Sequence, residues 1–261
     1  MTTSTSATSA RVMANKVPQV IVVFWVIKIL GTTVGETAAD YLNEHLGLGL
    51  TWTTVIVAAV LTGFLVLQFR AHRYVPWTYW TVVVLISIVG TLITDNLTDH
   101  WNVSLVVSTA VFAVLLTVVF LVWYRFEGTL SIHTITTTRR EAFYWLTILF
   151  TFALGTAAGD LVSERANLGY WEAGLIFAGL IAGVALAHFR FGLGEVPAFW
   201  AAYILTRPFG ASLGDYLTQT KPDGGLGLSA NGVSLVFLVL IMIAVGYLTR
   251  RENQRLASLS A

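Results

Sequence analysis

The chain has 261 residues, of which 56% are hydrophobic and only 11% charged, and its mean hydropathy is +0.75. Ordinary soluble domains contain about 25% charged residues, so this composition predicts an integral membrane protein. The net charge of +1 argues against a nucleic-acid partner, and a chain without cysteine has no disulfide and no thiolate chemistry.

Residues 1–16 are rich in Ser, Thr and Ala and lack the pattern of a signal peptide, so they are expected to form a disordered tail. A helix needs about 20 apolar residues to cross a bilayer. Eight such segments predict an all-α fold of eight transmembrane helices, at 17–41, 51–70, 76–97, 103–125, 141–163, 171–190, 196–218 and 229–250. They form one transmembrane domain over 17–251, followed by a tail over 252–261.

Basic residues gather at one set of helix ends, from Arg11 to Arg255, whereas the opposite loops carry only Arg165 and Lys221. Short cytoplasmic loops carry an excess of Lys and Arg. The asymmetry therefore predicts that both termini are cytoplasmic and that the loops following the first, third, fifth and seventh helices lie outside.

One motif recurs four times, as "GTTVGETAAD" from 31, "GTLITDNLTD" from 90, "GTAAGDLVSE" from 155 and "GASLGDYLTQ" from 210. Fifteen residues before its first acid stands a tryptophan in three copies (Trp80, Trp145 and Trp200) and Ile21 in the first. Each copy belongs to a repeat of two predicted helices, and the repeats cover 17–73, 74–127, 141–192 and 195–251. We expect four hairpins that enter the membrane from the same side and are related by an axis along the membrane normal.

With these repeats the chain resembles a family of bacterial membrane proteins that contain four tandem copies of a repeat of unknown function, each with two transmembrane helices and a characteristic tryptophan. The resemblance extends over 17–250, and Ile21 is its one departure from the tryptophan pattern. It implies an all-helical protein of the bacterial inner membrane and implies no activity.

The motif places small residues four apart, a spacing that lets helices approach closely in lipid. The glycines expected at such contacts are Gly31, Gly35, Gly90, Gly155, Gly159, Gly210 and Gly214. If the four motif helices pack centrally, their first acids lie at one depth; these first-tier acids are Glu36, Asp95, Asp160 and Asp215. The second-tier acids follow four residues later on the same helical face and are Asp40, Asp99 and Glu164, with Gln219 at the fourth position.

Two cations, Lys28 and Arg207, lie eight residues before Glu36 and Asp215, near mid-membrane. An unpaired charge at this depth is costly, so both are expected to pair with carboxylates. Four first-tier carboxylates and two cations leave a formal charge of minus two, which two protons or one divalent cation would neutralise.

Carboxylate ligands favour a hard ion such as Mg²⁺ or Mn²⁺. The leading hypothesis is a secondary transporter or exporter of a divalent cation, coupled to protons. In this hypothesis the seven acids of both tiers bind the cation, and the four first-tier acids also carry the protons. Lys28 and Arg207 are tethered counter-charges. No cofactor is expected, because the cation is the substrate, and the expected partners are lipids, the cation and protons. A homo-oligomer is compatible with the sequence.

Two other transport functions stay open: a channel for protons or monovalent cations, and an organic-anion or amino-acid carrier that binds its substrate through Lys28 and Arg207. An enzyme is not predicted, since the chain has no serine nucleophile elbow, no HExxH helix and no glycine-rich phosphate loop. A structural or assembly role is a further alternative.

Overall fold

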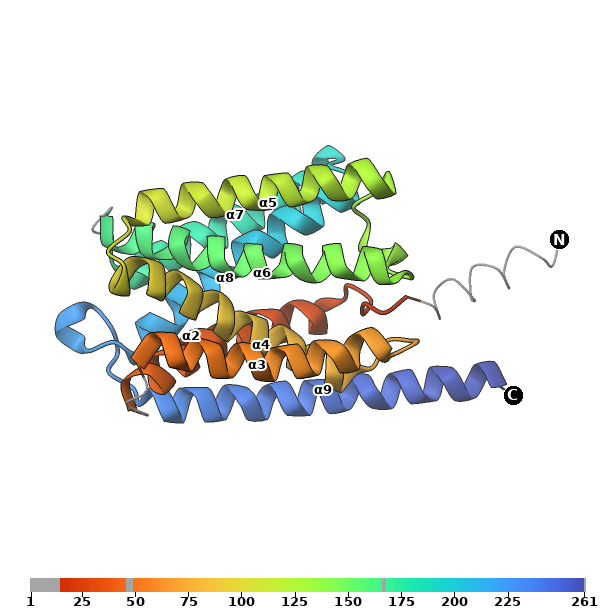
Figure 1. The fold of residues 1–261 in the computed structure, drawn as a ribbon, viewed down its shortest axis with the longest axis horizontal. Helices are drawn as coiled ribbons and strands as arrows, with labels where there is room; N and C mark the ends of the chain where they lie inside the picture. Colours follow the sequence, from red (N-terminus) through yellow and green to blue (C-terminus); the bar gives the residue numbers. More distant parts are fainter. Residues whose placement is uncertain (1–14, 46–48, 166–167, 261) are drawn as a thin grey trace.

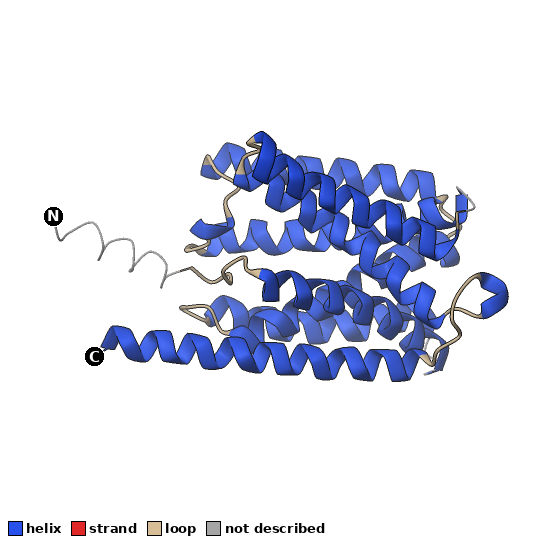
Figure 2. Cartoon of the chain, turned by 180° about the vertical axis from the view of Figure 1, so that it is seen from behind, coloured by secondary structure: helices blue, strands red, loops and turns tan. Residues whose placement is uncertain are grey.

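The computed structural model describes residues 15–45, 49–165 and 168–260. Within these ranges the chain consists of helices and loops, without a strand (Figure 2). The long helices are α2 (Val22–His45), α3 (Gly49–Arg70), α4 (Pro76–Asp95), α5 (Leu105–Glu127), α6 (Thr138–Asp160), α7 (Gly169–Phe191), α8 (Glu195–Thr218) and α9 (Ala230–Ser260). The short helical segments are η1 (Asn96–His100), η2 (Ile132–Thr134), η3 (Leu161–Arg165) and η4 (Lys221–Asp223). The predicted all-α class is confirmed.

Seven of the long helices in the described ranges are long and apolar enough to cross a membrane, and α8 is the exception. It covers the predicted segment 196–218 but carries Glu195, Arg207 and Asp215. It packs against α2, α6 and α7, so its polar side chains can face protein instead of lipid. Arg207, for example, is 0% exposed.

The four helices that carry the repeated motif, α2, α4, α6 and α8, form the inner ring of the bundle. α2 packs against α4, α4 against α6, α6 against α8, and α8 returns to α2. Glycines lie at these contacts: an added Cβ would collide with Phe152 at Gly90 and with Arg207 at Gly155. The other predicted packing glycines also face a neighbouring inner helix, namely Gly31, Gly35, Gly159, Gly210 and Gly214.

The outer helices do not pack mainly on the inner helix of their own repeat. Instead α3 packs against α4, α5 against α6, α7 against α8, and α9 returns to pack against α2 (Figure 1). The repeats are therefore continuous in sequence, but the expected two-helix hairpins are not packing units. Each connection carries its outer helix sideways, where it covers apolar surface on the next inner helix.

The first described residues differ from the predicted disordered tail over 1–16. Residues 1–14 of that tail lie outside the described ranges, but Asn15 and Lys16 are each 9% exposed. The Asn15 amide donates a hydrogen bond to the Ile132 carbonyl at 3.1 Å, and the Lys16 backbone N–H donates to the Ile135 carbonyl, also at 3.1 Å. One side-chain and one backbone hydrogen bond thus attach this segment to η2 and to the residue after it.

Lys16 also makes an ion pair that the sequence analysis missed. Its Nζ lies 2.6 Å from Glu141 Oε2, and Gln68 Nε2 donates to the other carboxylate oxygen of Glu141 at 3.0 Å. Glu141 stands in the first turn of α6, where a negative charge also suits the helix dipole. The sequence signal for this ion pair was Glu141 itself, an acid at the start of an apolar helix, where a buried carboxylate needs a cation as partner.

Helix α2 begins later than predicted, and helix α9 ends later than predicted. The first predicted segment begins at 17, whereas α2 begins at Val22; just before it the Ile21 backbone N–H donates to the Gln19 carbonyl at 3.1 Å, a tighter turn than an α-helix makes. At the other end α9 extends through most of the predicted tail over 252–261, to Ser260, because this stretch holds good helix formers and no proline or glycine.

Candidate functional site

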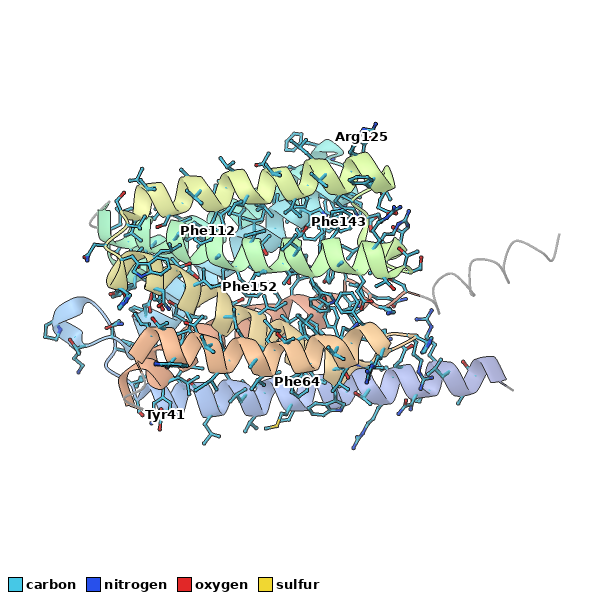
Figure 3. The ribbon with its side chains drawn as sticks, in the orientation of Figure 1. Tyr41, Phe64, Phe112, Arg125, Phe143 and Phe152 are labelled. Atoms are coloured by element: carbon cyan, nitrogen blue, oxygen red, sulfur yellow. The ribbon has the colours of Figure 1, made fainter. Side chains whose placement is uncertain are left out.

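An open pocket of about 540 Å³ lies between the inner ring and the first residues of α5 and α7. It is at the end of the bundle that holds Tyr41, opposite the end that holds Arg125 (Figure 3). The acids that line it are Glu36, Asp40, Asp95, Asp99, Asp160 and Asp215, and Gln219 joins them. The seventh predicted acid, Glu164, belongs to η3, and its side chain lies outside what the structure describes. The fourfold motif thus places six carboxylates around one cavity.

Two of the four repeats leave the α-helix at the pocket. Asp95 is the last residue of α4 and Asp160 the last of α6, and each is followed by a π-helical turn, η1 or η3. A π turn holds more residues than an α turn, so the second-tier acid is rotated away from the simple four-residue spacing. Asp99, within η1, nevertheless lines the pocket. Such turns often occur at functional sites.

Glu36 lines this pocket, and its ion pair with the fully buried Arg207 is called the pocket floor. Arg207 joins all four inner helices. Its Nη2 donates to Glu36 Oε2 of α2 at 2.5 Å, to Thr156 Oγ1 of α6 at 2.7 Å, and to Thr91 Oγ1 of α4. Thr91 Oγ1 in turn donates to Glu36 Oε2 at 3.2 Å. A single guanidinium nitrogen therefore contacts one residue from each of the other three inner helices, and the expected carboxylate partner of Arg207 is Glu36.

Part of the Arg207 guanidinium has no partner. Its Nε and Nη1 atoms are buried and make no hydrogen bond within the described residues. The buried hydroxyl of Ser87 makes none there either. Glu36, by contrast, is 7% exposed and lines the pocket, so water reaches the carboxylate side of the pair. The ion pair separates a wet acidic cavity from a dry layer beneath it.

Lys28 contradicts the expectation that both cations pair with carboxylates. Among the described residues it has no ion pair, although it is 1% exposed. Its Nζ lies 3.9 Å from the centroid of the Phe152 ring and 4.2 Å from that of Tyr203, and it donates to Thr32 Oγ1 at 3.4 Å. Glu36, the nearest acid on its helix, is taken by Arg207.

Aromatic side chains from all four inner helices fill the axis between this layer and the basic end. The Phe24 and Trp80 ring centroids are 5.4 Å apart, the hydroxyls of Tyr79 and Tyr144 are hydrogen-bonded, and the Tyr144 and Trp200 centroids are 6.2 Å apart. Each of these rings is at most 4% exposed. The pocket is thus closed on that side.

The sequence also carries a signal for this aromatic layer. A Tyr or Phe precedes Trp in every repeat, at 24–25, 79–80, 144–145 and 199–200. In the first repeat the pair comes one helical turn later than in the others, which is why Ile21 stands at the tryptophan position. The aromatic pair, not the tryptophan alone, is the repeated element.

The acids line the pocket wall separately and do not converge on one point. Within the described ranges, no group of three His, Asp or Glu side chains is arranged to hold a metal ion. In this conformation the pocket therefore lacks the compact ligand set that a dehydrated ion requires. A cation that keeps its water shell needs fewer direct protein ligands.

These features define a helical membrane protein with four tandem repeats around an acidic pocket. The repeat family described as Repeat of Unknown Function (DUF347) matches the chain four times, at residues 23–74, 78–129, 143–193 and 198–254. The chain belongs to this family, as the sequence predicts. No curated protein and no solved structure matches the chain.

Proposed function

We propose that the chain is a secondary carrier that moves a hydrated divalent cation across the bacterial inner membrane in exchange for protons. In this proposal all eight long helices cross the membrane, with both termini cytoplasmic and the four repeats related by an axis along the membrane normal. Seven apolar helices and the basic residues at one end support this placement. The acidic pocket then opens to the outside.

The observation that carries the proposal is the acidic pocket with a buried ion pair as its floor. Six carboxylates attract a cation into the cavity, and Glu36 at the bottom already holds a positive charge, the guanidinium of Arg207. A cation that reaches Glu36 competes with Arg207 for the same oxygen. Because Arg207 also contacts α4 and α6, its release alters contacts in the whole inner ring.

The size of the pocket and the spacing of its acids favour a hydrated ion. Mg²⁺ dehydrates reluctantly and commonly binds proteins through one or two carboxylates while keeping several waters. Six waters at about 30 Å³ each occupy about 180 Å³, one third of the pocket volume of about 540 Å³. A hydrated divalent cation therefore has room to contact the acids of one wall at a time.

The two other transport functions have less support. A channel needs a continuous path, whereas buried aromatic side chains fill the axis below the pocket. An anion carrier needs both cations to face its substrate, but Arg207 is bound to Glu36, and Lys28 lies among aromatic rings and does not line the pocket. A cation carrier, by contrast, needs acids that face the pocket and a path closed below it, and both are present.

The test is cation flux into proteoliposomes, with Mg²⁺, Mn²⁺, Ca²⁺ and Zn²⁺ supplied in turn and an internal pH reporter. Wild type is compared with Glu36→Gln and Asp160→Asn, and the matched control is Glu172→Gln, an exposed acid of α7 at the same end that does not line the pocket. We expect both pocket variants to lose flux and the control to keep it. Flux that survives both pocket changes, or absence of flux for every cation in wild type, overturns the proposal.

A further inference from the structure

Lys28 belongs to a layer of four equivalent positions, one in each inner helix. The other three are Ser87, Phe152 and Arg207, and all four side chains are at most 1% exposed. Figure 3 places Phe152 near the middle of the bundle's length. Its ring contacts both cations, with Lys28 Nζ 3.9 Å and Arg207 Cζ 5.8 Å from its centroid. Two buried cations thus share one aromatic neighbour, but only Arg207 has a carboxylate.

Arg207 and Lys28 differ in whether they can lose a proton. A guanidinium does not give up its proton in proteins, whereas a buried lysine does so readily. An ammonium that has no carboxylate partner gives up its proton more easily than a paired one. With Glu36 engaged by Arg207, no carboxylate among the described residues holds a proton on Lys28.

The same surroundings also accept the charged form. Two aromatic faces flank Nζ, and the faces of such rings attract an ammonium. The hydroxyl of Thr32 accepts a hydrogen bond from either form. Lys28 is therefore a side chain that can gain and lose a proton without moving to new partners.

The titratable and charged groups around Lys28 come from few elements. Helix α8 presents Tyr203 and Arg207, and α6 presents Phe152, which does not titrate. The titratable residues of α4 are Tyr79, bonded to Tyr144 of α6, and Asp95, which lines the pocket. On α9 the charged residues begin at Arg250, near the basic end, and on α2 the nearest acid is Glu36.

We propose that Lys28 carries the exchanged proton, an inference that rests on the proposed cation carrier. The floor of the pocket tolerates one added positive charge: either the cation, which displaces Arg207 from Glu36, or the proton on Lys28. A freed guanidinium beside Phe152 repels an ammonium at Nζ. Once Arg207 has left Glu36, water from the pocket reaches Nζ, and the Lys28 ammonium gives its proton to that water and becomes a neutral amine while the cation is bound. After the cation departs, the nitrogen lone pair takes a proton from water on that side. The carrier therefore holds either the cation or the proton, and it exchanges one for the other.

The first test reads the proton on Lys28 directly and needs no transport. The chain has three lysines, Lys16, Lys28 and Lys221, so protein labelled with ¹⁵N at lysine Nζ gives three signals, and Lys28→Met assigns one of them. We expect the Lys28 signal to change between amine and ammonium within the pH range in which an ordinary lysine such as Lys221 stays ammonium. An unchanging Lys28 signal over this range overturns the proposal.

The second test measures protons moved per cation in proteoliposomes. In Lys28→Met the proton movement is expected to fall to that of protein-free vesicles. In Lys221→Met, at an exposed position at the start of η4, it is expected to match wild type. Wild-type proton movement in Lys28→Met overturns the assignment and leaves the carrier in place. If wild type moves no cation, the proposed function fails, while the lysine signal still decides whether Lys28 exchanges a proton.

Discussion

The ion pair at the pocket floor predicts a strong energetic coupling between Arg207 and Glu36. Arg207→Met keeps much of the side-chain volume but removes the charge and all three hydrogen bonds made by Nη2. Glu36 is then a carboxylate at 7% exposure with only the Thr91 hydroxyl as donor. Glu36→Gln is the complementary change, because it leaves the guanidinium buried without a counter-charge.

The expected magnitudes follow from the burial of each partner. Breaking one side of a buried ion pair costs about 3 to 5 kcal/mol. Because the Glu36 side of the pair faces the pocket, we expect the lower end, about 3 kcal/mol for each single variant. The double variant leaves neither charge behind, so it should lose less than the sum, with a coupling energy of about 2 kcal/mol.

The assay is reversible unfolding of the purified protein in detergent micelles, applied to wild type, both single variants and the double variant. Arg190→Met is the matched control, since this arginine is exposed at the end of α7, and it should change the free energy of unfolding by less than about 0.5 kcal/mol. Additive losses, with a coupling energy below about 0.5 kcal/mol, would refute the reasoning.

Two further outcomes test the packing and the pocket. Gly155→Ala should destabilise by about 1 to 3 kcal/mol because the added methyl collides with α8, whereas Gly179→Ala, on an open face of α7, should be neutral or stabilise by up to about 1 kcal/mol; the same unfolding assay compares them. In this cysteine-free chain, Ser163→Cys at the pocket should react with a membrane-impermeant maleimide added outside, and Ser87→Cys in the dry layer should not. Equal labelling of the two cysteines would contradict the pocket boundary.

The inner half of the architecture could be predicted from the repeated motif alone. Glycines four apart and an acid after them imply close helix contacts with a carboxylate beside each contact, and the structure brings six of the seven acids to one pocket. This succeeded because the motif records a contact that each inner helix makes with its neighbour. Because the acids stand next to these glycines in the motif, packing of the inner helices brings the acids together.

Other features depend on three-dimensional choices that the motif does not record. Lys28 and Arg207 each stand eight residues before a first-tier acid, so both were expected to pair with a carboxylate. The packing of α8 on α2 brings only Arg207 to Glu36, and Lys28 contacts aromatic rings instead. Outer helices with apolar residues on all sides carry no mark of the helix they cover, so their packing on the next repeat was not predictable. The π turns after Asp95 and Asp160 likewise have no simple sequence signature.

The return of α9 to α2 has a consequence for how the protein is made. α9 follows α2 in the chain after six other long helices, so, in the proposed membrane placement, the surface on α2 that α9 covers faces lipid until α9 has been made. Packing of α9 on α2 is then a late step, which a chain that lacks α9 cannot complete. The described start of the chain and the end of α9 lie at the same end of the bundle (Figure 1). A circular permutant can therefore link these two ends and open the chain between α5 and α6. In this permutant α2 follows α9 directly in the chain, so the two helices are made one after the other.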